Sequence, residues 1–441
     1  MTRIDQGSDR SQSGGSQRVS GMNRRGFLKT TAAGLGGLAL STPMIARAQT
    51  GEDSKIVAVI LGQDGRGDLG WNDLAWHGGN LAKTQGVVED FTLFTTTENE
   101  ALALTQDLAS SGEYRIICSA TSALARVIPE VAAQYPDQNF AQLDITPEMA
   151  ADNPGKAGVM GLMFAQEQMS AQAGVLAAFL AAHHDFAKAG IVLGTEIAAL
   201  FDFEIGYKWG VDWGVEWLKA NMPDVLAGKK IEALAQNERV LWTYAGVWGD
   251  PAKGKAATEI QYQQGAGIVY QVAGGTGLGV LAAADDAHKA GNIEIGKPPF
   301  AIGVDADQGW LNPHVITSGM KRVDLAVLSA IKLAMEGKFR EAVAAGNNQL
   351  WMTLANGGVG LANKDTLVAA LDFARAAGAL DEAKVPEILS NYDILIAAQP
   401  EWIWPTLAQL GADIQTGTVE VPKPSADPVK WDIAAMRAKY G

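Results

Sequence analysis

The sequence predicts an α/β protein with doubly wound domains. Short apolar runs rich in Val, Ile and Phe alternate with longer helical stretches, as in parallel sheets with crossover helices. Glycine-rich turns follow several of the predicted strands. The chain has 441 residues, 47% of them hydrophobic, and is therefore long for one domain. Two sheets of about five or six strands each fit this length better than one.

The first part of the chain predicts buried strands separated by helices. The apolar runs do not alternate with polar residues, which is typical of strands covered by helices on both faces. The predicted strands span 55–61, 91–96, 114–120, 140–145 and 159–164, and the predicted helices lie near 72–85, 99–111 and 122–134.

The second part of the chain repeats this alternation. Predicted helices lie near 168–183 and 200–221, from 278 onward, and over 323–336, with strands over 189–194, 267–273 and 300–305. A proline-broken tail ends in a predicted helix near 430–439. Segments of these lengths indicate doubly wound units with right-handed crossovers.

The N-terminus has the features of an export signal. Arg24-Arg25 precedes an uncharged stretch over 30–46, and Ala46-Arg47-Ala48 resembles a cleavage site. We therefore expect residues 1–48 to be a twin-arginine signal region that is removed. The alternative is a buried helix that follows two arginines. Since no cysteine lies at the cleavage point, we expect a soluble periplasmic protein without a lipid anchor.

Composition excludes several classes of function. The chain has 49 acidic and 35 basic residues, a net charge of −14, which disfavours nucleic acid and anionic membrane surfaces as partners. Its single cysteine, Cys118, allows no intrachain disulfide and no Cys-rich metal site. The five histidines lack the spacing of metal ligands. The sequence thus predicts no metal site and no cofactor.

The first predicted strand runs into a glycine-rich turn over residues 64–73. Open α/β sheets bind ligands at the carboxyl ends of their strands, so this turn is a candidate ligand site. Asn72 is as suited to capping the following helix as to binding a ligand. Trp76, one turn into that helix, belongs either to the core or to a surface that stacks on a planar ligand.

A second glycine-rich turn, over residues 272–279, follows a later strand. It resembles a dinucleotide-binding fingerprint, but that fingerprint belongs after the first strand of a domain, with an acidic residue at the end of the second. The more plausible interpretation is that backbone N–H groups at this helix start face a polar or anionic ligand group.

Two carboxylates and a lysine follow the strand predicted over 300–305. Asp305 and Asp307 lie at and just past the end of that strand, and Lys321 lies sixteen residues after Asp305. A carboxylate that accepts and an ammonium group that donates suit a vicinal diol. A structural Asp–Lys ion pair is the alternative. A catalytic carboxylate pair is also conceivable, but no nucleophile or proton shuttle accompanies it.

Together these segments resemble the basic membrane protein family of ABC-transporter solute-binding proteins, similar to the purine nucleoside receptor A group. The resemblance spans roughly 54–422 and consists of seven motifs in order. They are Asp68-Leu-Gly-Trp-Asn-Asp-Leu-Ala-Trp76, Phe140-Ala-Gln-Leu-Asp144, Gly246-Val-Trp-Gly-Asp-Pro-Ala-Lys-Gly-Lys255, Gln271-Val-Ala-Gly-Gly-Thr-Gly-Leu-Gly279, Ile302-Gly-Val-Asp-Ala-Asp-Gln308, Lys321-Arg-Val-Asp324 and Gly357-Gly-Val-Gly360.

The resemblance implies a type I periplasmic-binding-protein fold, in which two doubly wound α/β lobes are joined by a three-segment hinge. We expect lobe 1 to comprise 53–164 and 300–340, lobe 2 to comprise 165–299 and 341–422, and a C-terminal tail to span 423–441.

The resemblance also implies a ligand site between the lobes. The aromatic clamp around a base falls on Trp76 and Trp248, where phenylalanine is common in the family. The remaining implied ligand residues are Asn72 and Asp144 at the base edge, Asp305 and Lys321 at the ribose, and the backbone of Gly274 and Gly275.

The resemblance implies a periplasmic receptor and not an enzyme. Such a receptor binds a purine nucleoside or related nucleobase and delivers it to an ABC permease. We expect a monomer. The alternative is an exported α/β enzyme such as a nucleoside hydrolase or a nicotinamide-dependent oxidoreductase. An effector-binding regulator with the same fold is a third class, which the export signal and the missing DNA-binding headpiece disfavour.

Overall fold

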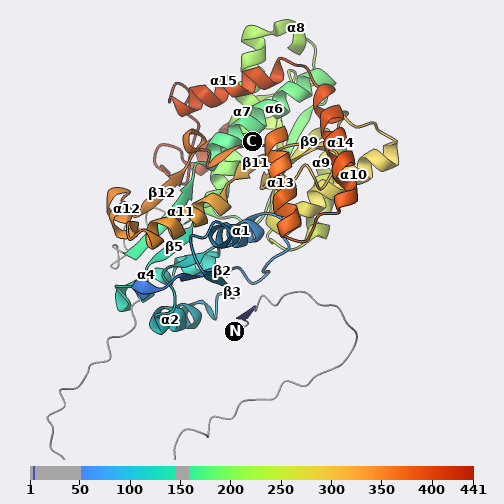
Figure 1. The fold of residues 1–441 in the computed structure, drawn as a ribbon. Coiled ribbons are helices and arrows are strands. Elements are labelled where there is room, and N and C mark those ends of the chain that lie inside the picture. The colour runs from blue at the N-terminus through green and yellow to red at the C-terminus, as the bar shows by residue number, and fades with distance from the viewer. Residues whose placement is uncertain (1–2, 5–50, 145–157) are drawn as a thin grey trace, which may run out of the picture.

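The computed structural model describes residues 3–4, 51–144 and 158–441, which form two lobes, each with its own sheet (Figure 1). The first sheet has the order β1-β3-β2-β4-β5-β6-β12 and the second has the order β13-β11-β10-β9-β7-β8. Strands of the first sheet are β1 (Arg3–Ile4), β2 (Ile56–Leu61), β3 (Asp90–Thr95), β4 (Ile117–Ser119), β5 (Phe140–Leu143), β6 (Val159–Phe164) and β12 (Gln349–Met352). Strands of the second are β7 (Lys188–Leu193), β8 (Val240–Tyr244), β9 (Ala266–Val272), β10 (Phe300–Asp305), β11 (Val315–Lys321) and β13 (Val359–Leu361).

Both lobes have the same doubly wound topology. The first five strands from β2 onward, and the first five from β7 onward, each lie in the order second, first, third, fourth, fifth. All neighbours in these two sets pair in parallel, and the antiparallel pairs are β1 with β3 and β11 with β13. Ligands in such sheets bind where the strand order reverses, at the carboxyl ends of the strands. The predicted pair of doubly wound lobes is confirmed.

Helices cover the faces of both sheets, so the central strands are apolar throughout. In β2 the five residues from Val57 to Leu61 are fully buried. The helices of the first lobe are α1 (Trp71–Thr84), α2 (Ala101–Ser111), α3 (Ser122–Ala125), α4 (Ile128–Gln134), α11 (Val323–Met335) and α12 (Phe339–Ala345). The remaining described helices are α6 (Gln166–His184), α7 (Ala198–Asn221), α8 (Pro223–Leu226), α9 (Pro251–Gln263), α10 (Gly277–Gly291), α13 (Lys364–Ala376), α14 (Val385–Ala397), α15 (Ile403–Gln415) and α16 (Ile433–Tyr440).

The longest helices of the second lobe, α6 and α7, pack at very short range. A Cβ atom added at Gly174 of α6 would lie 2.1 Å from the carbonyl oxygen of Tyr207, and one added at Gly210 of α7 would lie 2.1 Å from that of Ala171. These glycines allow the two helix backbones to pack in contact.

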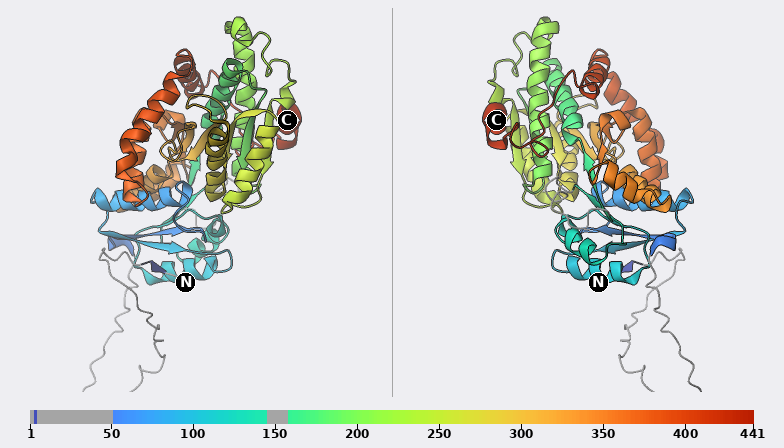
Figure 2. Two further views of the ribbon diagram at one scale, coloured as in Figure 1. Left: turned by 90° about the vertical axis from the view of Figure 1, so that its right-hand side faces the viewer. Right: turned by 90° about the vertical axis from the view of Figure 1, so that its left-hand side faces the viewer.

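The chain crosses between the lobes three times. It leaves the first sheet after Phe164 and enters α6, returns after Lys321 into α11, and leaves β12 again to reach β13. Figure 2 shows α11, in orange, beside the blue and teal first lobe, and Arg115 of that lobe donates a hydrogen bond to the carbonyl oxygen of Ala334 in α11. The predicted three-segment hinge therefore consists of these crossovers.

The sheets divide the chain differently from the predicted lobe boundaries. We expected 300–340 in lobe 1, but β10 and β11 extend the second sheet in parallel from β9, and only the part from α11 onward belongs to the first lobe. We expected 341–422 in lobe 2, but β12 pairs with β6 of the first sheet. The first crossover, after β6, lies where we expected it. The second follows β11 instead of preceding β10, and the third follows β12 instead of preceding it.

Within the described residues, no helix combines the length and apolar character that a membrane span requires. The predicted signal region, residues 1–48, lies outside the described residues except for Arg3–Ile4.

Candidate functional site

An ion pair joins the two lobes at the carboxyl ends of their strands. Lys321 ends β11 of the second sheet, is 2% exposed, and donates hydrogen bonds of 3.0 and 2.7 Å to the two carboxylate oxygens of Asp144, which follows β5 of the first sheet. The ammonium nitrogen also lies 4.6 Å from the ring centre of Trp71, 4.7 Å from that of Phe164 and 5.5 Å from that of Phe203. A buried cation is thus held by one carboxylate and three aromatic faces.

A second carboxylate, Asp305, faces the same region from the end of β10. It is 8% exposed, and its backbone has a φ of 65°, which is unusual for a residue other than glycine. Among the described residues, no group donates a hydrogen bond to its carboxylate. Burial raises the pKa of Asp305 to about 7, although the charge of Lys321 acts in the opposite direction. The oxygens of Asp305 are absent from the fully buried side-chain atoms that lack a partner, so they keep some accessible surface and can accept from a ligand.

The structure places Asp305 near Lys321, as predicted, but the two do not form an ion pair. Lys321 pairs directly with Asp144, whereas Asp305 influences it through space and lies against the first lobe. A Cβ atom added at Gly70, just before α1, would lie 3.7 Å from an Asp305 carboxylate oxygen. Asp305, in the second lobe, therefore lies close to the N-terminus of α1 in the first lobe.

The first glycine-rich loop is organised by Asp68. Its Oδ1 atom accepts hydrogen bonds of 3.1 Å from the backbone N–H groups of Gly70 and Asp73, and its Oδ2 atom accepts from the backbone N–H of Asn72 at 2.8 Å. The Asn72 side chain donates to Asp68 at 3.1 Å and accepts from the N–H of Gly62 at 3.2 Å. The carboxylate of Asp68, rather than the side chain of Asn72 or Asp73, therefore accepts from the backbone N–H groups at the start of α1. Asn72 links the loop to Gly62, just after β2.

Trp76 is nearly buried, and a guanidinium group covers one face of its ring. The side chain is 4% exposed, and the Cζ atom of Arg66 lies 3.6 Å from its ring centre. Arg66 is held there by Asp73, which accepts a 2.9 Å hydrogen bond from its Nε atom. The indole N–H of Trp76 has no hydrogen-bond partner among the described residues. The face of this ring is therefore occupied by the guanidinium group of Arg66.

In the second lobe, Trp248 packs beside Gly274 and Gly275. A Cβ atom added at Gly194 would lie 2.3 Å from the Trp248 ring, so the indole packs directly on the end of β7. Its carbonyl oxygen accepts a 2.7 Å hydrogen bond from the N–H of Thr276, and an added Cβ atom at Gly275 would lie 3.3 Å from that oxygen. The structure thus brings these three predicted residues together.

The two walls approach each other beside Trp248. A Cβ atom added at Gly249 would lie 3.6 Å from the carboxyl carbon of Asp64 in the first loop, the same loop that carries Arg66. The predicted sandwich of a base between Trp76 and Trp248 remains a prediction, as do the ligand roles of the other predicted residues.

Sequence reasoning missed two buried carboxyl groups near the ion pair of Lys321 and Asp144. Asp202 of α7 is 2% exposed and Glu167 of α6 is 6% exposed. Burial raises the pKa of Asp202 to about 6, and burial together with the nearby Asp202 charge raises that of Glu167 to about 8. Neither lies in a glycine-rich turn or at a strand end, so the loop signals that identified the other candidates did not include them.

Comparison with known proteins identifies the family of this arrangement. A model of the Bmp family, described as ABC transporter substrate-binding protein PnrA-like, matches residues 55–213 and 229–390. The chain belongs to the Bmp family. Bmp proteins are substrate-binding components of ABC transporters, so the expected resemblance is confirmed.

Relatives of this Bmp protein include an uncharacterized lipoprotein of Pyrococcus abyssi, which is 30% identical over 374 residues and covers 83% of this chain and 84% of its own length. The ABC transporter nucleoside-binding protein BmpA of Lactococcus lactis is 26% identical over 321 residues, or 69% of this chain and 80% of BmpA.

A solved structure supports the fold. The ABC transporter solute-binding protein of Aeropyrum pernix K1 has a TM-score of 0.71 and 28% identity, and the match covers 88% of this chain and 99% of that chain. The type I periplasmic-binding-protein fold is confirmed.

The predicted location is wrong. We expected a twin-arginine-exported periplasmic protein without a lipid anchor, but the similar proteins of Pyrococcus abyssi, P. horikoshii and P. furiosus are all named lipoproteins. These names contradict the expectation of a protein without a lipid anchor. The expectation failed because it depended on the residues next to a single assumed cleavage site.

Proposed function

We propose that this Bmp-family protein binds a purine nucleoside or a related nucleobase between its lobes and delivers it to an ABC permease. The observation that carries the proposal is the buried Asp305 carboxylate, which has no donor among the described residues and lies near the interlobe pair of Lys321 and Asp144. The name of the L. lactis relative, a nucleoside-binding protein, agrees with it.

In this proposal the sugar and the base use different walls of the cleft. Ribose hydroxyls donate to Asp305, and Lys321 donates to a ribose oxygen while it keeps its contact with Asp144. The base lies between Trp76 and Trp248. The guanidinium group of Arg66 now stacks on Trp76 and would be displaced by the base, which is planar as well.

Such a ligand would also control the arrangement of the lobes. Asp305 and Trp248 belong to the second lobe, and Trp76 and Asp144 belong to the first, so a ligand that contacts all four stabilises the closed form over the open one. We propose that the protein binds and releases its ligand unchanged, as a monomer, and is not an enzyme. Chromatography of a nucleoside incubated with the protein should recover the nucleoside intact.

A thermal-shift panel tests the ligand class. Purine nucleosides or bases should raise the melting temperature, and the stabilisation should reach about 2.7 kcal/mol at a hundredfold excess over the dissociation constant. Sugars and amino acids serve as controls. A shift with either control class and none with nucleosides or bases would refute the proposed ligand.

The aromatic clamp can be tested separately by calorimetry. Trp248→Ala and Trp76→Ala should each weaken binding at least about tenfold, because each removes stacking and buried area. Trp209→Ala is the matched control, since Trp209 packs on Trp213 in α7. Equal affinities for the wild type and the Trp248 variant would remove Trp248 from the site.

A further inference from the structure

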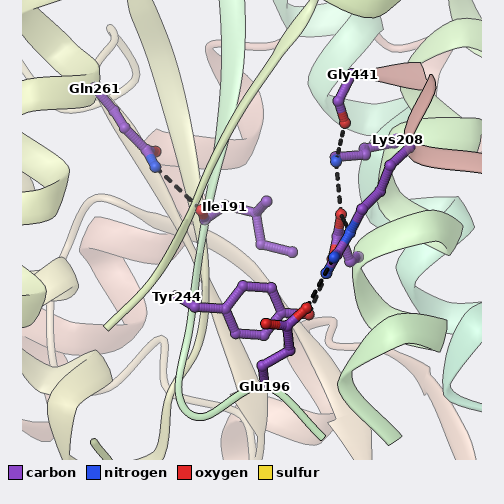
Figure 3. Close-up of polar contacts among 8 residues, drawn as sticks. Ile191, Glu196, Lys208, Tyr244, Gln261 and Gly441 are labelled. Carbon is purple, nitrogen blue, oxygen red and sulfur yellow. Dashed lines mark hydrogen bonds and ion pairs between the residues drawn. The ribbon is translucent and has the colours of Figure 1, made fainter. Parts of the chain in front are cut away.

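The end of the chain returns to the second lobe and is anchored there by buried charges. We call residues 421–441 the C-terminal strap. Arg437 in its helix α16 donates hydrogen bonds of 2.8 Å to Glu204 and to Glu196, and Glu204 is fully buried. Lys208 donates to Glu204 at 2.7 Å and also to the carbonyl oxygen of Gly441 (Figure 3). The last residue of the chain is therefore fixed in place.

The other end of the strap is attached to the first turn of α7. The backbone N–H of Ser425 donates a 2.8 Å hydrogen bond to Oδ1 of Asp202, and the Ser425 hydroxyl donates to Oδ2 of the same carboxylate. Val421 and Tyr440 are 5% and 4% exposed, so the strap is packed at both ends. It lies beyond residue 390, where the match to the Bmp family model stops.

Ser425 lines a small pocket next to the interlobe ion pair. The pocket is formed by the first crossover, by the start of α7, by β12 and by the strap. Its lining residues are Asp144, Met163, Phe164, Gln166, Ala199, Trp351 and Ser425. Because Asp144 is the partner of Lys321, the pocket adjoins the cleft in which we place the ligand.

Gln166, which lines this pocket, has a buried acceptor without a partner among the described residues. Its side chain is 3% exposed, its Nε2 atom donates a 3.0 Å hydrogen bond to the carbonyl oxygen of Ala199, and its Oε1 atom has no partner among the described residues. The amide cannot be turned round, because its oxygen would then face the Ala199 oxygen. A buried carbonyl oxygen without a donor favours a ligand that supplies one.

We propose that the C-terminal strap completes the ligand site, and that Ser425 and Gln166 form a subsite beside Asp144 for a hydrogen-bond donor, the exocyclic amino group of a purine. The proposal rests on the proposed function. The Ser425 hydroxyl already donates to Asp202, so its lone pairs remain to accept, as do the oxygens of Gln166 and Asp144. All three groups accept, and an amino group donates twice.

Adenosine and purine riboside test this subsite, since they differ only in the amino group. By calorimetry, the full-length protein should bind adenosine about tenfold more tightly than purine riboside. Ser425→Ala should weaken adenosine about threefold to tenfold and leave purine riboside within about twofold. Thr418→Ala, at an exposed hydroxyl just before the strap, should change neither affinity.

The possible results separate this inference from the proposed function. If the wild type binds no nucleoside or base, both fail. If it binds adenosine and purine riboside equally, or if Ser425→Ala matches the wild type for both, the subsite alone is refuted. Should Ser425→Ala not fold, Ser425→Thr keeps the hydroxyl and adds a methyl group to the pocket wall. It should then lower the affinity for adenosine, and an unchanged affinity would overturn the subsite.

Discussion

Two glycine-rich loops border the cleft, and although their sequences look alike they are built in different ways. In the first loop, here taken as residues 62–73, carboxylates accept from backbone N–H groups. Asp68 accepts from three of them, and Asp73 accepts from those of Gly67 and Leu69 at 2.9 Å. The start of α1 therefore already holds an internal anion. The first loop contributes charged and planar side chains to the cleft.

In the second loop, residues 273–279, the glycines allow close packing. An added Cβ atom at Gly279 would lie 1.8 Å from the carbonyl oxygen of Pro251, and one at Gly277 would lie 1.7 Å from the Gln271 side-chain oxygen. The glycines thus allow α10 to pack against α9. This packing accounts for the glycines without a bound anion at the helix start. A glycine-rich turn after a strand therefore indicates a loop at the interlobe boundary. It does not indicate whether the loop supplies charged side chains or close backbone packing.

The largest expected effect is the pH dependence of stability that Asp305 causes. Asp305 lies next to the first loop, whereas the second loop has no ionisable side chain. In the unfolded chain an aspartate titrates near 3.8, whereas the pKa of Asp305 is about 7. Between these values only the folded protein binds the proton, so the stabilisation present below pH 3.8 is lost as pH rises through 7. Unfolding of the ligand-free protein should show a loss of about 2–4 kcal/mol from this group. Asp305→Asn should flatten the profile, and an unchanged slope would contradict the assignment.

The packing role of the second loop predicts the next largest effect. Gly279→Ala should lower the free energy of unfolding by about 1–3 kcal/mol, because its methyl group would meet the Pro251 carbonyl. The matched change in the first loop is Gly62→Ala, where the nearest atom would be 3.8 Å away. Urea denaturation measures both. Similar losses in the two variants would mean that the loops do not differ in packing.

Removing the internal anion of the first loop should cost somewhat less. Asp68→Ala deletes the acceptor for three N–H groups and should lower stability by about 1–2 kcal/mol in urea denaturation. Asp68→Asn retains one oxygen and should lose less. If the two variants were equally stable, the capping role of the carboxylate would be disproved.

The smallest effect on stability is expected for Arg66, whose side chain is 31% exposed. Arg66→Ala should change the free energy of unfolding by only about 0.5 kcal/mol, since its ion pair with Asp73 is open to solvent on one side. It should, however, tighten the binding of a free base, because the base no longer displaces the guanidinium group from Trp76. Calorimetry with adenine measures this, and weaker binding would show that Arg66 contacts the ligand directly.

The strands that sequence predicted well are those buried on both faces. The segments 55–61 and 300–305 are unbroken apolar runs and became β2 and β10. β11 was missed because its sequence, VITSGMK, contains polar residues that are buried in the folded protein, such as Thr317, whose hydroxyl donates to the carbonyl oxygen of Ala362. Burial of that kind depends on tertiary neighbours, which a local pattern does not contain.

The same limit applies to the site. Asp144 and Lys321 were each identified, but their pairing joins residues 177 positions apart on different sheets. Ser425 had no sequence signal, since it is one serine in a proline-rich tail whose position depends on Asp202. The sequence could indicate which loops end at the cleft, but only the packed lobes determine which side chains meet there.

The central claim is that the Asp305 carboxylate accepts hydrogen bonds from the ribose hydroxyls of a nucleoside. Calorimetric titration of Asp305→Ala with adenosine and with adenine tests it most directly. A hydrogen bond to a charged group is worth about 1.5–3 kcal/mol, so the variant should bind adenosine roughly tenfold to a hundredfold more weakly than the wild type. Adenine lacks the ribose and should lose much less. An equal loss for both ligands, or no loss for either, would contradict the claim and make Asp305 a structural residue.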